Sequence, residues 1–307
     1  MQVSRPALGF SIGVCASDSS PNLPSLLSFL LAEDFGGFVL QSLVVVASGC
    51  DKNVVSEARK MADSDSRILL ITEPERRGKA EAINRIVENT VGEFLVMVNS
   101  DAVPEAGSVR KLLSVASEDE SVGCVSAMPI FDSRANMTSS LIDLVWTAHN
   151  ESSLALNHMN LSNHASDELI VIRSSIVTRL PAGVVNDGAF IAGTARLRGY
   201  KVKFCPPARV HIETPGRVAD VIGQRRRILF GHAQVWRRLG TPPRTIESLI
   251  LIAPLTALRL LARTVARNPR SILVLPVALV TEVSAAVLSI WDSLRSSKRH
   301  TVWRRYT

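Results

Sequence analysis

The sequence is poor in cysteine and in aromatic residues. Its 307 residues include four cysteines, and aromatic side chains make up 5%. The cysteines are Cys15, Cys50, Cys124 and Cys205. Their spacing is neither CxxC nor disulfide-dense, which excludes a disulfide scaffold and disfavours a cysteine-based metal site. Buried thiols in a reducing compartment are expected. Residues 1–9 lack the basic and apolar regions of a signal peptide.

Several catalytic signatures are also missing. The chain contains no GxxxxGK[ST] phosphate loop, no HxxxH or HExxH zinc motif and no GxSxG nucleophile turn. P-loop chemistry, zinc hydrolysis and serine-triad hydrolysis are therefore disfavoured. Apolar residues at 46% and charged residues at 21% are ordinary for a chain that buries a core, which excludes disorder, collagen and coiled coil.

Charge is distributed unevenly along the chain. Residues 1–203 carry 18 Lys and Arg against 23 Asp and Glu, a balance of −5. Residues 204–307 carry 17 against 5, a balance of +12. A basic C-terminal third suits phosphates, nucleic acid or an anionic membrane. Neither a recognition-helix motif nor aromatic residues interleaved with the basic ones support nucleic-acid binding. No nucleic-acid partner is therefore expected.

The first part of the chain alternates between apolar, β-branched runs and helical patterns. Strands are expected at Leu8–Cys15, Phe38–Ala47, Arg67–Thr72, Glu93–Val98, Val122–Met128, Glu168–Ile172 and Tyr200–Cys205. Helices are expected at Asn22–Glu33, Asn53–Asp63, Lys79–Asn89, Glu105–Ser117, Ser139–Leu156, Gly188–Arg198 and Val218–Leu239. This order predicts an α/β domain with a mostly parallel sheet covered on both faces. Ligands of such sheets bind outside the carboxyl ends of the strands.

Two apolar stretches, Ile246–Ala262 and Ile272–Trp291, follow the last of these helices. Each contains a proline and at least one charged residue, which weakens the prediction of a spanning helix. The basic and aromatic residues around them are typical of helices that lie in an anionic leaflet, and packing on the body is the alternative. We expect the α/β domain to span residues 1–240. The extension, residues 241–307, would be peripheral or integral at the cytoplasmic face of the membrane.

Four polar segments follow expected strands. They are Cys15–Ser20, Ala47–Asp51, Arg76–Lys79 and Asn99–Ala102. Cations at a helix start stabilise phosphate together with N-terminal amides, so Arg77 and Lys79 form a candidate diphosphate site. Asp101 is a candidate ligand of a hard divalent cation. Helix capping by Asp18 and Asp101, and a solvated basic turn at residues 76–79, are the alternative interpretations.

A further candidate lies in the basic helix expected at Val218–Leu239. Consecutive arginines at 225–227 cannot all face one ligand, because successive helical residues are turned by about 100°. Gln224 and Arg227, three residues apart, share one face and can reach the crevice together. A solvated basic face is the alternative.

These segments, in this order, resemble an inverting family-2 glycosyltransferase of the GT-A fold, and most of all its membrane-associated archaeal and bacterial members. Gly13–Asp18 takes the place of the family's first strand and its CAYNE or PAYNE turn. The other matches are Val45–Asp51 to VVASGCTD, Arg77–Asn84 to REGKAxAIN, Asn99–Asp101 to the DxD motif, and Gln224–Ile228 to QxxRW with Ile in place of Trp. The resemblance covers about residues 9–240.

The resemblance implies sugar transfer from a nucleotide-diphosphate sugar to a lipid-linked or surface-glycan acceptor. It implies donor contacts from Ala16, Asp18, Asp51, Arg77, Gly78, Lys79, Asn84, Ser100, Gln224 and Arg227. Asp101 would bind Mg²⁺ or Mn²⁺ on the diphosphate, and the metal would neutralise charge on the departing nucleoside diphosphate as a Lewis acid.

The catalytic base is the least complete part of the resemblance. The family has two adjacent acids before a helix that ends in Gly-Tyr, and the second acid is the base. Counting back from Gly199 places Asp187 on the first acid and Gly188 on the second, whereas a shift of one residue makes Asp187 the base and Asn186 its predecessor. Asp187 is expected to be the base, because no other acid in this region is available to deprotonate the acceptor.

Two other interpretations stay open. The missing second acid and the reduced DxD motif permit a catalytically degenerate subunit that binds a nucleotide sugar or acts as a scaffold. A sugar nucleotidyltransferase is the third interpretation. It is disfavoured because the glycine-rich first loop of those enzymes is absent between Cys15 and Pro24.

Overall fold

The structure is a computed structural model, and it describes residues 8–18, 22–132, 136–267, 271–295 and 300–301. One eight-stranded sheet has the order β3-β2-β1-β4-β7-β6-β8-β5. Its strands are β1 (Leu8–Asp18), β2 (Phe38–Cys50), β3 (Ile68–Glu73), β4 (Phe94–Asn99), β5 (Ala102–Pro104), β6 (Val122–Ile130), β7 (Leu169–Arg173) and β8 (Lys201–Ile212).

Most of the sheet is parallel, as the sequence predicts. β1 is parallel to β2 and β4, β2 is parallel to β3, and β6 is parallel to β8. β7 is antiparallel to β4 and β6, and β5 is antiparallel to β8. The nearly continuous apolar runs of the central strands follow from burial on both faces of the sheet.

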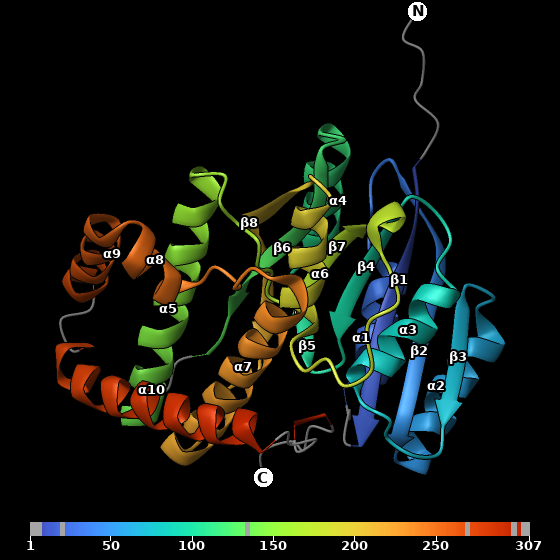
Figure 1. Ribbon diagram of the computed structural model, residues 1–307. Coiled ribbons are helices and arrows are strands. Elements are labelled where there is room, and N and C mark those ends of the chain that lie inside the picture. Colours follow the sequence, from blue (N-terminus) through green and yellow to red (C-terminus); the bar gives the residue numbers. More distant parts are fainter. Residues whose placement is uncertain (1–7, 19–21, 133–135, 268–270, 296–299, 302–307) are drawn as a thin grey trace, which may run out of the picture.

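Helices cover both faces (Figure 1). They are α1 (Leu23–Ala32), α2 (Lys52–Ser64), α3 (Lys79–Glu88), α4 (Ser108–Glu118), α5 (Met137–His158), α6 (Asp187–Leu197), α7 (Val218–Leu239), α8 (Ile246–Ile252), α9 (Pro254–Arg267) and α10 (Ser271–Leu294). One core cluster includes Leu27 of α1 and Leu112 of α4. A second cluster, across the sheet, includes Ile83 of α3, Ala192 of α6 and Val235 of α7. The sheet therefore separates two apolar layers.

Several boundaries differ from the sequence prediction. β1 and β2 each run three residues further than expected, to Asp18 and Cys50. The segment between the expected strand Tyr200–Cys205 and the expected helix Val218–Leu239 begins as strand. β8 continues to Ile212 and accommodates its two prolines with a shift of register against β6. The turn after β4 leads into the short strand β5. The stretch Ile246–Ala262 is divided between α8 and α9, because Pro254 has no N–H with which to continue the backbone bonding of α8.

Candidate active site at the carboxyl edge of the sheet

The ends of β1 and β2 lie beside the loop that leads to α3. Asp18 is opposite Cys50 in the pairing of the two strands, and the side chain of Asp18 lies outside the described residues. A Cβ on Gly49 would lie 2.7 Å from Cγ of Arg76, so only glycine lets the loop approach so closely. Three segments that the sequence suggests as separate candidates are therefore neighbours.

β4 and β7 complete this edge. Cys15 of β1 pairs with Asn99 of β4, and the Asn99 N–H donates to the Glu168 carbonyl over 3.1 Å. Because β7 is antiparallel to β4, the start of β7 meets the end of β4. Asp101, which follows β4, and Asp167, which precedes β7, thus belong to the same edge of the sheet.

Lys79 is the centre of the charged groups at this edge. Its Nζ contacts the carboxylates of Asp167 and Asp187, and it lies 3.0 Å from Oδ2 of Asp187. The Lys79 and Asp187 side chains are 24% and 5% exposed. Lys79 is the first residue of α3 and Asp187 is the first residue of α6. One cation therefore joins two helix N-termini to the segment before β7.

Burial and mutual attraction decide the charges of this cluster. Burial opposes the charge of Lys79, but Asp167 and Asp187 outweigh burial and raise the pKa of Lys79. Burial also opposes the charge of Asp167, but Lys79 holds the pKa of Asp167 below its usual range. Burial raises the pKa of Asp187, an effect that Lys79 opposes and Asp167 reinforces. The two carboxylates therefore differ in basicity, and Asp187 is the more basic of the two.

Two other titratable groups border the cluster. Burial, reinforced by Asp167, raises the pKa of Glu168 to about 7, although Ser166 donates its hydroxyl to that carboxylate. Burial raises the pKa of the Cys15 thiol to about 12. Cys15 is therefore a neutral thiol at neutral pH and not a nucleophile.

A helix cap and close backbone packing hold the start of α6 in place. Asn186 caps the helix, its Oδ1 accepting a first-turn N–H over 3.0 Å. A Cβ on Gly188 would lie 2.4 Å from the Ala165 carbonyl oxygen, and a Cβ on Gly231 of α7 would lie 2.7 Å from Cβ of Asn186. These two close approaches fix the position of Asp187 between the segment before β7 and α7.

The consecutive arginines of α7 diverge. Arg227 donates to the Val185 carbonyl over 3.4 Å, and its charge helps Lys79 to lower the pKa of Asp167, so it faces the cluster. Arg225 and Arg226 instead bind carboxylates of α10. Gln224, half-buried, lies three residues before Arg227 on the same face of the helix.

The other expected donor residues have different surroundings. Ala16 and Ser100 are buried where β1 and β4 end. Asp51 is exposed at the N-cap position of α2. Asn84 is buried, and its amide bonds the Leu180 carbonyl at 2.9 Å and the Leu180 N–H at 2.7 Å. Asn84 thus ties α3 to the segment that precedes α6.

Asp101, the expected metal ligand, exposes its carboxylate at this edge. Within the part of the chain that the structure describes, no three His, Cys, Asp or Glu side chains are grouped as a metal site. Mg²⁺ and Mn²⁺ accept one protein carboxylate when diphosphate and water supply the remaining oxygens. Asp101 therefore fits a cation that binds together with a nucleotide.

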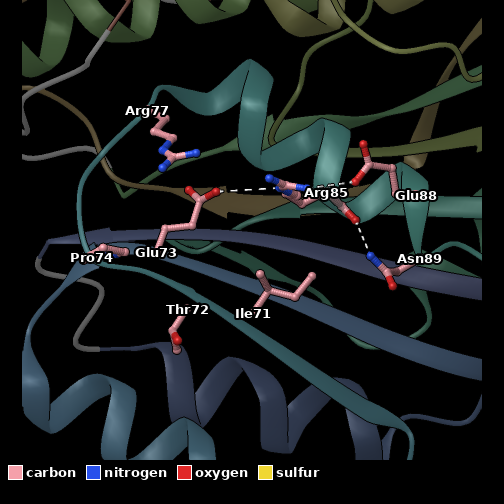
Figure 2. Close-up of a pocket in the computed structure, with 8 residues that line it drawn as sticks. All are labelled: Ile71, Thr72, Glu73, Pro74, Arg77, Arg85, Glu88 and Asn89. Carbon is pink, nitrogen blue, oxygen red and sulfur yellow. Dashed lines mark hydrogen bonds and ion pairs between the residues drawn. The ribbon is translucent and has the colours of Figure 1, made fainter.

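A hollow of about 330 Å³ lies between the end of β3 and α3 (Figure 2). It is lined by Ile71, Thr72, Glu73, Pro74, Arg77, Arg85, Glu88 and Asn89. Glu73 accepts the Ser48 hydroxyl at 2.9 Å and lies 4.0 Å from Arg85, and Arg77 approaches it from the start of α3. Gly78, with φ +97°, turns the chain from this hollow toward Lys79.

Sequence comparison decides the family. A profile of glycosyltransferase-like family 2 matches residues 6–231, from β1 into α7. The chain belongs to glycosyltransferase-like family 2. No functionally curated protein sequence matches this family 2 chain.

Solved structures share the fold. The mannosyltransferase PcManGT from Pyrobaculum calidifontis, in complex with GDP-Man and Mn²⁺, is 21% identical with a TM-score of 0.65, over 94% of this chain and 88% of that one. GalNAc-T7 with UDP, GalNAc and Mn²⁺ is 11% identical with a TM-score of 0.50, over 67% of this chain and 44% of that one. The expected GT-A fold is confirmed.

Two acids of this family 2 site are not among the residues expected from the sequence. Asp167 contacts Lys79, and Glu168 follows it directly. A usable signal exists, because the pair stands beside the apolar strand β7. In a parallel sheet the site residues follow the strands. β7 is antiparallel to β4, so the acids that precede it lie at the same edge.

Proposed function

We propose that the chain transfers a sugar, with inversion, from a nucleotide-diphosphate sugar to an acceptor hydroxyl. The observation that carries the proposal is the contact of Lys79 with Asp167 and Asp187 at the carboxyl edge of a GT-A sheet. A diphosphate is stabilised by cations and helix N-termini, and a hydroxyl is deprotonated by a carboxylate. This edge offers both kinds of group.

Asp187 is the proposed base. The acceptor oxygen bonds to the anomeric carbon as the bond from that carbon to the diphosphate oxygen breaks, and Asp187 takes the hydroxyl proton. A raised pKa suits a group that accepts a proton, while Lys79 favours the ionised form before reaction. A side chain at position 188 would clash with the Ala165 carbonyl oxygen, so this helix start has room for a single acid, Asp187. Close packing thus accounts for the glycine at the position of the family's second acid, and this weighs against a catalytically degenerate site.

The donor would lie along the edge between β1 and α7. Lys79, Arg77 and Arg227 supply positive charge for the diphosphate. The remaining proposed donor contacts are Ala16, Asp18, Asp51, Gly78, Ser100 and Gln224, with Asn84 holding the loop before α6. Asp101 would hold Mg²⁺ or Mn²⁺, which neutralises charge on the departing nucleoside diphosphate when it is bound.

The proposed location is the cytoplasmic face of a membrane, and the proposed acceptor is lipid-linked or a surface glycan. α10 is long and apolar enough to cross a membrane by length and composition. The four cysteines are free, as is usual in a reducing compartment. β1, β2 and β3 end at the side of the molecule along which α10 runs (Figure 1). A membrane-anchored acceptor on that side would lie close to the carboxyl edge.

A nucleotide panel and one variant test the proposal. Thermal shift with nucleoside diphosphates and Mn²⁺ should identify a stabilising nucleotide, since a ligand of the native state raises its stability. With the corresponding donor, Asp187→Asn should keep nucleotide binding and lose roughly 10²–10⁴-fold in transfer rate. Asp63→Asn, an exposed acid of α2, is the control and should behave as wild type. Unchanged transfer by Asp187→Asn would remove the base assignment.

A further inference from the structure

The polarity of α10 is the reverse of that of an ordinary surface helix. Its buried residues are Ser271, Val274, Thr281, Ala285, Ser289 and Asp292, most of them polar. The large apolar residues exposed on it include Leu273, Leu279, Val280, Val283, Val287 and Leu294. A helix on a water-facing surface buries its apolar side and exposes its polar side. The solvent side of α10 is instead suited to a hydrocarbon environment.

α8 and α9 carry a matching outer face. Leu251, Leu255 and Leu258 are 84%, 68% and 63% exposed. Their inner residues pack on α5, where Leu249 and Leu260 form a cluster with Leu156. α10 packs on α5 as well, through Val277 and Ala278. Figure 1 shows the three helices together on the side of the molecule opposite β3. We call the exposed apolar side of α8, α9 and α10 the docking face.

Cations border the docking face. Arg259 and Arg263 are exposed on α9 among its leucines, and Arg295 follows α10. The Arg295 guanidinium lies 4.1 Å from the ring centre of Trp291, which is 51% exposed. Arginine and tryptophan beside an apolar face are typical of the headgroup region of a bilayer. The basic residues expected beyond 295 and at 268–270 lie outside the described residues.

Ion pairs hold α10 against the body along its length. Arg225 of α7 binds Glu282 at 2.7 Å, and Arg226 binds Asp292 at 2.5 Å. Ten residues separate the two acids, which is about 15 Å of helix. A helix that crossed the bilayer alone would carry these acids into hydrocarbon without their partners, at a high cost. The pairs therefore favour a helix that lies in the membrane surface.

We propose that the docking face inserts into one anionic leaflet, so that α8, α9 and α10 lie in the bilayer surface and none of them crosses it. This deepens the proposed membrane location, and it does not depend on catalysis. A second copy of this chain is the less suitable occupant, because a self-complementary contact would bring Arg259 and Arg263 near the same cations of the other copy. An anionic leaflet neutralises those charges instead.

Vesicle sedimentation of the full chain, without donor or acceptor, tests this inference. The chain should bind vesicles that contain phosphatidylglycerol at least tenfold more tightly than vesicles of phosphatidylcholine alone. Leu255→Glu with Leu258→Glu should weaken binding to both at least tenfold. Leu197→Glu replaces a leucine of α6 that is 57% exposed and not part of the docking face, and it should leave binding unchanged. Arg259→Gln with Arg263→Gln should weaken binding to the anionic vesicles and not to the neutral ones.

Three results would overturn the inference. One is equal vesicle binding by wild type and the Leu255→Glu, Leu258→Glu variant when both are folded by circular dichroism. Another is retention of the chain on vesicles after alkaline carbonate washing, which indicates a spanning helix. The third is a dimer in light scattering that those same two substitutions dissociate, which assigns the face to a second copy. Nucleotide binding by the Leu255→Glu, Leu258→Glu variant is measured separately, so failure of the active-site proposal is distinguishable.

Discussion

Replacing Lys79 by methionine removes a charge that contacts both Asp167 and Asp187. Methionine keeps most of the apolar stem, so the main loss is electrostatic. Removing one partner of a buried pair typically costs about 3–5 kcal/mol, and the partial exposure of Lys79 and Asp167 places the expected loss at about 3 kcal/mol at pH 7.5. Urea unfolding followed by far-UV circular dichroism measures it.

The pH dependence of the loss follows from the pKa shifts. The pKa of Lys79 is raised, so Lys79 itself stays charged below its unfolded pKa, and the stability it contributes at acidic pH is limited by the ionisation of its partners. Its partners protonate as the pH falls, Asp187 first because its pKa is raised and Asp167 later because its pKa is lowered. The destabilisation by Lys79→Met should therefore be smaller at pH 4 than at pH 7.5.

Lys201→Met is the matched control. Lys201 pairs with Asp119 at 2.9 Å, but the two side chains are 37% and 43% exposed. An exposed pair contributes about 0–1 kcal/mol. If Lys79→Met cost no more than this control, or lost the same stability at both pH values, the account of a buried, cation-centred cluster would be wrong.

Three further substitutions have defined outcomes. Gly188→Ala should lower the free energy of unfolding by about 1–3 kcal/mol through overpacking, while Gly223→Ala, whose added Cβ meets open space, should not lower it. Differential scanning calorimetry compares the two variants. Equal melting temperatures would contradict the close packing of α6. Arg173→Met should lower the free energy of unfolding in urea by about 3 kcal/mol, because buried Arg173 binds Glu93 at 2.6 Å and donates to the carbonyls of Val122 and Ala116. A loss below about 1 kcal/mol would contradict this role of Arg173. Asp101→Asn should raise the Mn²⁺ concentration for half-maximal transfer by roughly tenfold or more, and an unchanged value would exclude Asp101 as a ligand.

The α/β order could be predicted from the sequence because it depends on local patterns. Continuous apolar runs such as Phe94–Asn99 are buried on both faces, and helix-period runs such as Val218–Leu239 keep their predicted bounds. Strand direction depends on contacts far apart in the chain. For this reason the reversal of β7 was not predictable from the local sequence of Leu169–Arg173.

The candidate site was predictable only in part. Lys79 and Asp187 carry motif signals, whereas Asp167 joins them only because β7 is reversed and brings its first residues to the end of β4. The divergence of the α7 arginines follows from helical geometry. Which arginine binds α10 depends on Glu282 and Asp292, more than fifty residues away, and no local pattern reports that contact.

The most direct test of the account is a crystal structure with a nucleoside diphosphate and Mn²⁺ bound. We expect the diphosphate to bind at the carboxyl edge, where Lys79 contacts its oxygens and Asp101 binds the metal. Asp187 should face the position of the donor sugar. A diphosphate seated instead in the hollow beside Arg85, with Asp101 not bound to metal, would contradict the central claim that these groups form one transfer site.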